Sequence, residues 1–415
     1  METLEKLKKY NQTRTLKLIE NLSKDKAKSA ALTELLKSLE TVDFDELFKI
    51  YNESKQEVIV DETKIKQLPY LVKKELNPCL EKLFYDLGTE VLNSGQYAVV
   101  TMAGGQGTRL GHDGPKGTYS LDIDGSRKFI FEILKENLEE TNQKTGKIIP
   151  WYIMTSPEND APTKNFFKNH DYFNYSKEDI TFFKQNHMPL IDVYDQLLID
   201  KNYHLKEASD GTGSVYRSLK NGGCLEDMKT RGIKWVFIGG VDNILLKQAD
   251  RILLGMAIFK NVEIASKTIV KSYPEEKVGL FCQYDNHPRV IEYSEMPIEI
   301  SYEEDENHEL KYKEAHIMCN LYTIDALEYL AEKTLPYHIA FKKNSYLDEF
   351  GTEIIPKEPN SYKLESFLFD GFPYFDNIAL LRGDREEDFA PIKNKEGKDS
   401  SETAKVLYKR YHATH

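Results

Sequence analysis

The chain contains 415 residues, of which 40% are hydrophobic and 30% are charged, and its formal net charge at pH 7 is −12. This composition is typical of a globular protein with two or three domains and argues against a disordered chain. The negative charge argues against a general nucleic-acid surface, so any phosphate site must be locally basic.

Two further features bear on where the protein works. The N-terminus lacks an apolar signal core, and no run approaches the roughly 20 apolar residues of a membrane-spanning helix. The absence of any C-x-x-C pair favours reduced thiols over a disulfide framework or a zinc site. We therefore expect a cytoplasmic protein without a membrane partner. The four scattered cysteines are Cys79, Cys224, Cys282 and Cys319.

Residues 1–95 are predicted to form an N-terminal helical region. Asp43 can cap one helix in this region, ahead of an apolar stretch. Few side chains here could carry chemistry, so we expect a helical cap on a catalytic domain. A stripe with the i, i+3, i+4, i+7 spacing of another helix is formed by Leu32, Leu35, Leu36 and Leu39.

Residues 96–355 alternate between strand and helix patterns and are predicted to form the catalytic domain. This alternation predicts an α/β sandwich around a mixed, mostly parallel sheet. In such sheets, ligands sit beyond the carboxyl ends of the strands. The candidate strands cover residues 97–103, 148–155, 180–185, 234–241, 262–269, 289–294 and 315–322.

Residues 356–415 are predicted to form a short C-terminal region. It holds an apolar run at residues 378–381. A last helix is predicted from Asp399 and Glu402, which have the spacing of a helix start.

The stretch from residue 97 to residue 117, YAVVTMAGGQGTRLGHDGPKG, carries the main functional signal. An apolar run closed by glycines predicts a buried central strand followed by a turn. Backbone N–H groups in such a turn can form an anion-binding nest. Arg109 and Lys116 follow seven residues apart. Strand, glycine turn and two cations together favour a polyphosphate site over a plain turn with solvated cations.

Two well-known phosphate motifs do not fit this stretch. A Walker A loop requires Gly-Lys-Ser/Thr, whereas Lys116 here precedes Gly117. A dinucleotide fingerprint requires G-x-G-x-x-G, and the glycines here are one residue too far apart. The pattern G-G-x-G-T-R-L-G followed by P-K-G instead resembles the signature of the eukaryotic-type UDP-sugar pyrophosphorylases, which join UTP to a sugar 1-phosphate.

The resemblance continues through separated elements to about residue 405 and implies an α/β fold with a three-layer, Rossmann-like nucleotidyltransferase (GT-A-like) domain. It implies that Arg109 and the turn amides hold the β- and γ-phosphates, and that Lys116 acts near the α-phosphate. Gln185 would read the uracil, because a side-chain amide matches its donor–acceptor edge. The nucleotide contacts implied are Ala103, Gly104, Gly105, Gly107, Thr108, Gln185, Gly211 and Asp242.

A second apolar strand, WVFIGGVDN, ends in Asp242 and Asn243. A carboxylate at the carboxyl end of a strand can hold a magnesium ion that bridges phosphate oxygens. Taken alone, a strand-ending Asp-Asn is more often a turn or a helix cap. The resembled family also has VDN here, which implies that Asp242 contacts the nucleotide and Mg²⁺.

The resemblance places the sugar contacts at Thr212, Gly279, Glu292 and Asn320. A carboxylate and an amide suit a polyol, because each can bind two hydroxyls. Thr212 stands where the N-acetylglucosamine enzymes typically carry Asn. A threonine hydroxyl can donate one hydrogen bond but cannot present the two-sided amide of Asn.

The element APIKN ends the resemblance, and by analogy Lys393 reaches back from the C-terminal region to the phosphates. A single lysine in a charged tail is usually solvated, so only the motif supports this role. The chain ends soon after Lys393, where many relatives continue into a larger β domain. We therefore expect a monomer.

These features predict a uridylyltransferase that uses Mg²⁺ and converts UTP and a sugar 1-phosphate into a UDP-sugar and pyrophosphate. The motif IEYSE and the sequence of the glycine loop most closely resemble the members of this family that use N-acetylglucosamine 1-phosphate. Thr212 leaves open glucose or galactose 1-phosphate, or a relaxed enzyme that accepts several sugars. A non-enzymatic alternative is a nucleotide-sugar sensor, which the intact set of Arg109, Lys116, Asp242 and Lys393 argues against.

Overall fold

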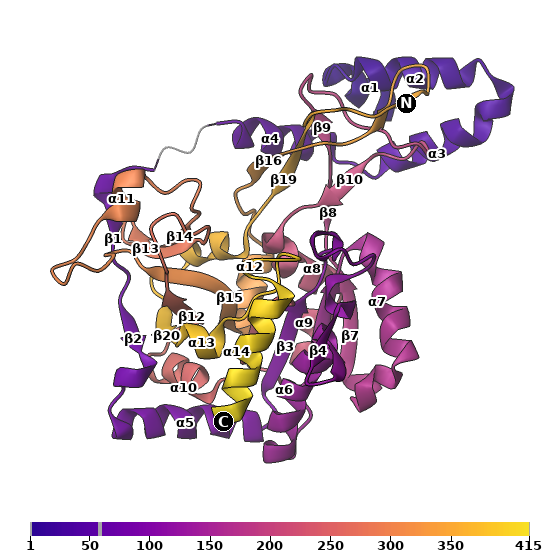
Figure 1. Cartoon of the computed structure of the whole chain (residues 1–415). Coiled ribbons are helices and arrows are strands. Elements are labelled where there is room, and N and C mark those ends of the chain that lie inside the picture. Colours follow the sequence, from indigo (N-terminus) through magenta and orange to yellow (C-terminus); the bar gives the residue numbers. More distant parts are fainter. Residues whose placement is uncertain (1, 57–59, 415) are drawn as a thin grey trace. The chain divides into compact units, whose positions relative to one another are not determined.

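The computed structural model describes residues 2–56 and 60–414 and contains two compact units (Figure 1). The helical unit comprises residues 2–56, 186–214 and 334–368. The sheet unit comprises residues 60–185, 215–333 and 369–414. These units divide the chain differently from the boundaries predicted at residues 95 and 355.

The helical unit begins with helices whose inward faces follow the predicted pattern. The leucine stripe lies on the third of them, where Leu35 and Leu39 are fully buried. Asp43 caps the fourth as predicted, because its carboxylate accepts hydrogen bonds from the N–H groups of Asp45 and Glu46. The helices are α1 (Glu2–Lys9), α2 (Thr13–Ser23), α3 (Ser29–Glu40) and α4 (Phe44–Ser54).

Later segments complete the core of the helical unit, since the short helices cannot bury their apolar faces alone. Leu197, Leu347 and Leu364 pack in one cluster with residues of α1 to α4. This shared core explains why the units do not follow the predicted boundaries. The later segments form the sheet β16 (His338–Lys342), β19 (Ser361–Glu365) and β9 (Ile191–Asp192), and the pairs β8 (His187–Pro189) with β10 (Glu207–Ser209) and β17 (Tyr346–Leu347) with β18 (Glu353–Ile354).

The sheet unit is built on one large twisted sheet with the strand order β2-β20-β12-β15-β11-β3-β6-β7. Neighbouring strands in this path are parallel except where β15 pairs with β11 and β12. The predicted mixed, mostly parallel sheet is therefore confirmed. The strands are β2 (Tyr70–Val72), β3 (Tyr97–Met102), β6 (Trp151–Thr155), β7 (Ile180–Lys184), β11 (Trp235–Gly240), β12 (Ile264–Val270), β15 (Glu314–Thr323) and β20 (Ala379–Arg382).

The C-terminal segment belongs to this sheet rather than to a separate region. The apolar run predicted at residues 378–381 becomes β20, which pairs in parallel with β12 and β2. The sequence pattern also did not reveal β13, which joins β14 and β1 at the edge of the sheet. The candidate strand at residues 289–294 corresponds to β14 (His287–Ile291). The other strands are β1 (Ile65–Lys66), β4 (Ser120–Ile123), β5 (Ser126–Phe129) and β13 (Leu280–Tyr284).

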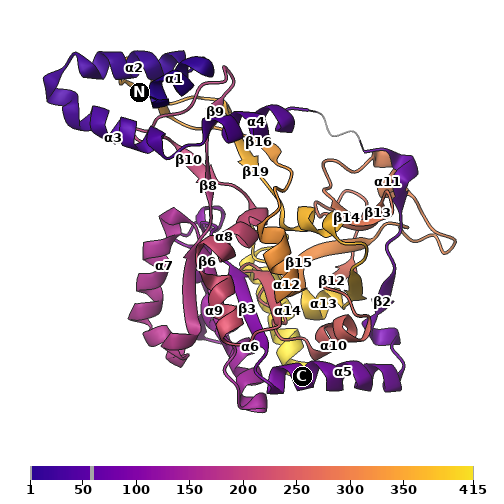
Figure 2. The ribbon, with the colours of Figure 1, turned by 180° about the vertical axis from the view of Figure 1, so that it is seen from behind.

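Helices cover both faces of the large sheet. In Figure 1 the yellow helix α14 lies on the near face, whereas in Figure 2 α8 and α9 are on the near face. No helix of the described residues is long and apolar enough to cross a membrane. The helices are α5 (Pro78–Asn93), α6 (Ile130–Thr145), α7 (Pro157–Asn169), α8 (Val215–Asn221), α9 (Cys224–Thr230), α10 (Arg251–Phe259), α11 (Ile298–Tyr302), α12 (Ile324–Ala331), α13 (Arg385–Asp388) and α14 (Ser401–Thr414).

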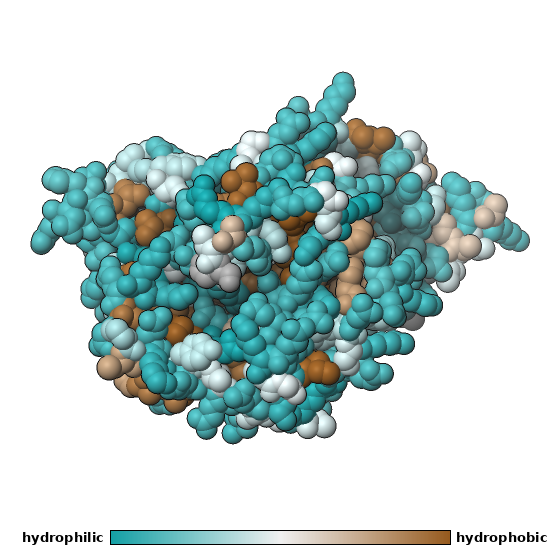
Figure 3. Space-filling view, turned by 60° about the horizontal axis from the view of Figure 1, so that its bottom comes forward, coloured by the Kyte–Doolittle hydropathy of each residue, from teal (hydrophilic) through white to brown (hydrophobic). Residues whose placement is uncertain are grey.

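The surface agrees with the charged composition. The face in Figure 3 is mostly hydrophilic, and its hydrophobic residues lie in small separate groups. All four cysteines are unpaired thiols, and Cys224, Cys282 and Cys319 are buried. Burial raises the pKa of each of these three thiols to about 12, so they are protonated at neutral pH.

A charged cluster is buried beside the large sheet. The Lys267 ammonium, on β12, is 1% exposed and contacts both the Asp250 carboxylate and, at 2.8 Å, Asp388 Oδ1. Burial works against ionisation, but attraction to the two carboxylates holds the pKa of Lys267 well above its ordinary value. Burial would raise the pKa values of Asp250 and Asp388, but attraction to Lys267 lowers both below their ordinary values.

We predict that Lys267→Met destabilises the protein by about 3–5 kcal/mol near neutral pH, because it removes the buried cation that the Asp250 and Asp388 carboxylates share. In the wild type the depressed carboxyl pKa values contribute stability above the ordinary pKa of about 4, and this stability is lost as pH falls through the folded values. In the variant, burial favours the protonated carboxyls. The difference in the free energy of unfolding should therefore narrow as pH falls from about 7.5 to about 5.

Chemical denaturation of both proteins at the two pH values measures this difference. Lys229→Met is the matched control, because Lys229 forms an exposed pair with Glu328 at 2.9 Å. The control should change the free energy of unfolding little, because an exposed ion pair is screened by solvent. A difference for Lys267→Met that stays constant with pH would show that packing, rather than charge, is responsible.

Candidate active site

The glycine loop, residues 103–118, begins where β3 ends and is anchored by helix α7. The Ala103 N–H extends the strand ladder by donating to the Met154 carbonyl at 2.8 Å. The Asn159 side-chain amide, in the first turn of α7, donates to the carbonyls of Gly104 and Gly105 at 2.8 and 3.0 Å. Asn159 is fully buried. The start of the loop is therefore fixed by a buried side chain on a neighbouring element.

The rest of the glycine loop folds back on its own start. The Lys116 N–H donates to the Gly105 carbonyl at 3.0 Å, so Lys116 lies beside the glycines that precede it. The Gly107 N–H donates to Gly114 at 2.8 Å. A Cβ on Gly107 would lie 2.8 Å from the His112 ring, so this position requires glycine. Gly107 therefore shapes the loop, and the N–H predicted to bind a phosphate closes the loop instead.

Lys116 and Asp242 meet at the carboxyl edge of the sheet. β11 lies beside β3 in parallel, so the residues that follow the two strands are neighbours. The Lys116 ammonium is 3.6 Å from Asp242 Oδ2. Burial would raise the pKa of Asp242, but attraction to Lys116 and Lys393 holds it below its ordinary value. Asp242 is therefore ionised at neutral pH.

The segment that carries Lys393 also comes to this edge. The Ile392 N–H donates to the Asp242 carbonyl at 2.8 Å, and the Lys393 N–H donates to Asp399 at 2.7 Å. Arg109 and Thr108 lie in an exposed 3₁₀ turn of the glycine loop. The structure thus brings together Lys116, Asp242 and Lys393, and it presents Arg109 to solvent on the same loop.

Gln185 lies at the carboxyl end of β7, against the start of the glycine loop. Its N–H donates to the Thr155 carbonyl at 2.7 Å, and the residue is 8% exposed. Its Oε1 would be 2.6 Å from a Cβ on Gly104. Gln185 and the first glycine of the loop are therefore in direct contact.

Three of the predicted sugar contacts form a chain of neighbours within the sheet unit. A Cβ on Gly279 would lie 3.3 Å from Glu292 Oε1, and the Gly279 carbonyl accepts the His316 N–H at 2.9 Å. His316 Nε2 lies 3.1 Å from Asn320 Oδ1. Burial lowers the pKa of His316 to about 4, so this imidazole is neutral. Asn320 is fully buried, and its Oδ1 also accepts from Ser266 at 2.8 Å.

The remaining predicted contacts, Gly211 and Thr212, belong to the helical unit. Gly211 has a φ of +90°, and a Cβ there would be 2.1 Å from the Ser366 carbonyl oxygen, so glycine is required. Thr212 Oγ1 accepts the Leu368 N–H at 3.0 Å, which leaves its hydroxyl proton available to donate. Within the helical unit, residues 366–368 therefore fix this loop.

Two residues that position the site were missed by the sequence analysis. Asn159 was not recognised, although the adjacent Ser156-Pro157 is a helix-start signal directly after β6. Met318 has a φ of +55° and lies at an irregularity between β12 and β15, close to Gly240. Such bulges re-aim side chains near sites, but no sequence pattern marked this one.

The residues at the carboxyl edge fit a magnesium ion that is held largely by substrate. Among the described residues, no three His, Cys, Asp or Glu side chains gather as a metal site. Mg²⁺ is often held by one or two carboxylates together with substrate phosphates. The ionised Asp242 carboxylate suits that arrangement.

The fold and this edge define an α/β nucleotidyltransferase. The structure is similar to that of the UDP-N-acetylglucosamine pyrophosphorylase from Trypanosoma brucei in complex with an inhibitor, with a TM-score of 0.79, 28% identity and coverage of 97% of this chain and 83% of that one. A UDP-glucose pyrophosphorylase from Leishmania major shares the fold at 17% identity, with a TM-score of 0.66 over 88% of this chain and 77% of the other.

Sequence comparison gives the family. Residues 41–406 match the model of the UTP–glucose-1-phosphate uridylyltransferase family, so the chain belongs to that family. It is 36% identical to UDP-N-acetylglucosamine pyrophosphorylase of Saccharomyces cerevisiae over 97% of this chain and 85% of the relative. It is 34% identical to UDP-N-acetylglucosamine diphosphorylase 2 of Arabidopsis thaliana over 99% of this chain and 83% of the relative. The family resemblance seen in the sequence is confirmed.

We predict that Gly104→Ala weakens UTP binding by about tenfold, the equivalent of one lost hydrogen bond, because the new methyl group displaces the Gln185 amide. Calorimetric titration with UTP measures the change. In a Gln185→Ala background the same glycine substitution should have little further effect. An equal loss in both backgrounds would mean that the methyl group acts on the nucleotide itself and not through Gln185.

Proposed function

We propose that the protein is a uridylyltransferase that condenses UTP with N-acetylglucosamine 1-phosphate to UDP-N-acetylglucosamine and pyrophosphate. The observation that carries this proposal is the meeting of Lys116, Asp242 and Lys393 beside the glycine loop. Two cations and one ionised carboxylate at the carboxyl edge of the sheet suit a bound polyphosphate. Family membership and the names of the relatives support the same reaction.

The chemistry requires no covalent enzyme intermediate. A sugar-phosphate oxygen attacks the α-phosphorus of UTP in line, the bond to the bridging oxygen of the β-phosphate breaks, and pyrophosphate leaves with that electron pair. The protein contributes by aligning the reactants and by neutralising charge. We assign Lys116 to the α-phosphate, Arg109 with the amides of Gly104 and Gly105 to the departing phosphates, and Lys393 to the sugar phosphate.

Magnesium completes this assignment. Asp242 would hold the ion, which would supply a Lewis acid between phosphate oxygens. The depressed pKa of Asp242 keeps its carboxylate available as a ligand across the neutral range. Lys116, whose ammonium lies 3.6 Å from the same carboxylate, would neutralise charge on the phosphates beside the ion.

Two groups of residues bear on the choice of sugar. Glu292 and Asn320 would bind sugar hydroxyls, and Gly279 leaves room beside Glu292. The names of the relatives favour N-acetylglucosamine 1-phosphate. Thr212 favours the second candidates, glucose or galactose 1-phosphate, because a hydroxyl cannot pair with both polar atoms of an acetamido group.

We also propose that the protein acts in the cytoplasm, without a nucleic-acid or membrane partner. The unpaired thiols support a reducing compartment. The net charge of −12 argues against a nucleic-acid surface. The monomeric state stays a prediction.

The first test is pyrophosphate release from UTP and Mg²⁺ with each of three sugar 1-phosphates: N-acetylglucosamine, glucose and galactose. We expect release with N-acetylglucosamine 1-phosphate, and a kcat about 10²-fold lower in Lys116→Ala, which loses a charge near the reacting phosphate. Lys229→Ala, which removes an exposed lysine of the sheet unit, should leave kcat unchanged. If no pyrophosphate is released with any of the three sugar 1-phosphates while UTP still binds, the nucleotide-sugar sensor would be favoured.

A second prediction concerns the sugar. Thr212→Asn should raise the ratio of kcat/KM for N-acetylglucosamine 1-phosphate over glucose 1-phosphate by about tenfold, the value of one added hydrogen bond. Thr212→Ser keeps the hydroxyl and should leave the ratio unchanged. The two ratios are measured side by side with the wild type. If Thr212→Asn and Thr212→Ser give the same ratio, residue 212 does not read the sugar.

A further inference from the structure

The segment that carries Lys393 is held against the strand end that carries Asp242. Asn243, which is 3% exposed, donates from its side-chain amide to the Asp388 carbonyl at 2.7 Å. The same side chain accepts the Ala390 N–H at 2.8 Å. Two backbone bonds flank these contacts, from Ile244 N–H to the Ala390 carbonyl at 3.2 Å and from Ile392 N–H to the Asp242 carbonyl at 2.8 Å.

We propose that Asn243 is a positioning residue that sets the place of the Lys393 ammonium, an inference that rests on the proposed uridylyltransferase reaction. Asn243 lies next to Asp242 in sequence and bonds to both sides of Phe389, four residues before Lys393. One side chain thereby fixes the distance between the carboxylate on one segment and the lysine on another. Asn suits this role because its amide both donates and accepts.

A second anchor holds the same segment from the other side. Asp388, at the end of α13, forms ion pairs through its Oδ1 with the ammonium groups of Lys267 at 2.8 Å and Lys247 at 3.2 Å. Its Oδ2 accepts the Asp384 N–H at 3.0 Å. Asp388 is 2% exposed, so these contacts are screened little by solvent. Asp388, whose carbonyl accepts the Asn243 side-chain amide, is therefore itself held in place by buried contacts.

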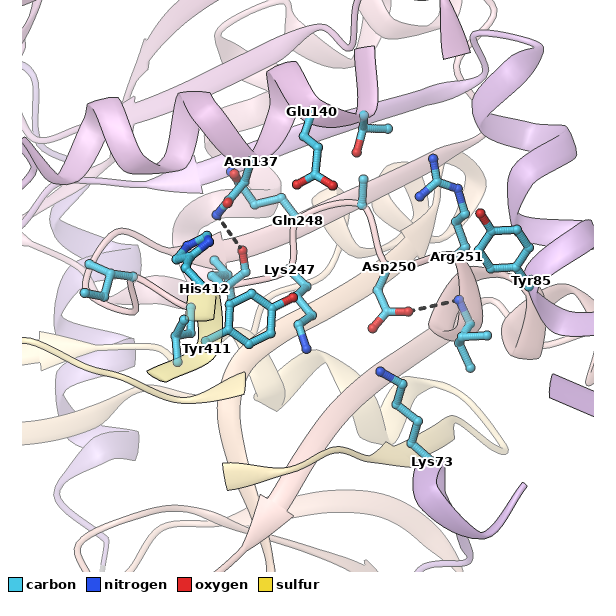
Figure 4. A pocket seen from close by; sticks show the side chains of 16 residues that line it. Lys73, Tyr85, Asn137, Glu140, Lys247, Gln248, Asp250, Arg251, Tyr411 and His412 are labelled. Atoms are coloured by element: carbon cyan, nitrogen blue, oxygen red, sulfur yellow. Dashed lines mark hydrogen bonds between the residues drawn. The ribbon is translucent and has the colours of Figure 1, made fainter. Parts of the chain in front are cut away.

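The segment is also tied down after Lys393. The chain continues into α14, where the Tyr411 ring makes a cation–π contact with the Lys247 ammonium, which lies 4.9 Å from the ring centre. Figure 4 shows Lys247, Asp250 and Tyr411 along one side of a pocket of about 350 Å³ that the loop after Asn243 shares with α14. Contacts before and after Lys393 thus leave only its long side chain to be placed.

We call the contacts of Asn243 with Asp388 and Ala390 the clamp. Charge repulsion explains why this clamp is required. Lys116 forms an ion pair with Asp242 at 3.6 Å, and Lys393 also attracts this carboxylate, so two ammonium groups of like charge are drawn to the same place and repel each other. A lysine side chain also has many rotamers, so its ammonium is costly to hold in one place. Holding its backbone prevents the segment from relaxing away before substrate binds. The clamp therefore holds the Lys393 ammonium near Asp242 before substrate binds, whereas an unrestrained segment would move it away.

A double-variant cycle with the full chain tests the proposal. Asn243→Ala should lower kcat/KM for the sugar 1-phosphate by about 10²-fold when Lys393 is present, the cost of a misplaced cation. In a Lys393→Ala background it should lower kcat/KM by less than about threefold, because the residue through which it acts is gone. Equal losses in the two backgrounds would overturn the proposal, since a role in the fold or in placing Asp242 would persist without Lys393.

Asn142→Ala is the matched control for lost stability. Asn142, on α6, donates to the Tyr175 hydroxyl and accepts the Ile149 N–H, each at 3.0 Å. This variant loses the same kinds of bonds away from the carboxyl edge, and kcat/KM should stay within about twofold of the wild type. A loss equal to that of Asn243→Ala would overturn the proposal.

A milder variant covers the case in which Asn243→Ala does not fold. In Asn243→Ser, a shorter hydroxyl can still accept the Leu245 N–H as the Asn243 side chain does, but it cannot span Asp388 and Ala390. We expect the same direction of change and the same dependence on Lys393. Unchanged kcat/KM in this variant would overturn the proposal.

Native-state proteolysis separates this inference from the proposed reaction, because it needs no turnover. Trypsin should cut after Lys393, Lys395 or Lys398 about tenfold faster in the Asn243 variants than in the wild type or Asn142→Ala. An unchanged cleavage rate would overturn the clamp. Faster cleavage together with a wild type that forms no UDP-sugar would instead uphold the clamp and reject the proposed reaction.

Discussion

The attraction of two lysines to one carboxylate is the constraint on which the rest of the site depends. Lys116 lies 3.6 Å from Asp242, and Lys393 further lowers the pKa of that carboxyl. The cluster without substrate carries an excess of positive charge, which a polyphosphate and its magnesium can balance. Such cations are useful only if they are fixed before the substrate arrives, because reorganising them would raise the barrier. The glycine loop and the Asn243 contacts supply that fixation.

Much of this edge could be predicted from the sequence, because each part directly follows an apolar strand. Tyr97–Met102 and Trp235–Gly240 read as buried strands, and parallel neighbours bring Lys116 and Asp242 to one edge. Asn159 could not be identified in the same way, since its role depends on where α7 packs. Likewise, no periodicity shows that residues 379–382 insert between β2 and β12. Non-local pairing, rather than local preference, decides both cases.

The buried polar groups of the sheet unit explain how distant segments find each other. Lys267 on β12, Asp250 at the start of α10 and Asp388 on α13 come from separate parts of the chain, and each is nearly inaccessible. An unpaired charge at any of these positions would be costly, so only one arrangement of the segments satisfies all three. Apolar packing alone would tolerate small slips of the segment before Lys393. The charged cluster, together with Asn243, removes that freedom.

The groups assigned to the phosphates all lie within one unit. The cations assigned to the phosphates, Arg109, Lys116 and Lys393, all belong to the sheet unit, whereas Gly211 and Thr212 belong to the helical unit. The glycine loop and the clamp are both complete within the sheet unit, so they do not depend on residue 212. A substitution in the loop at residues 211–212 can therefore change which sugar is accepted without disturbing the groups that act on the phosphates. Under the proposed assignment, residue 212 bears on the sugar alone, and the groups assigned to the phosphates do not depend on whether it is Thr or Asn.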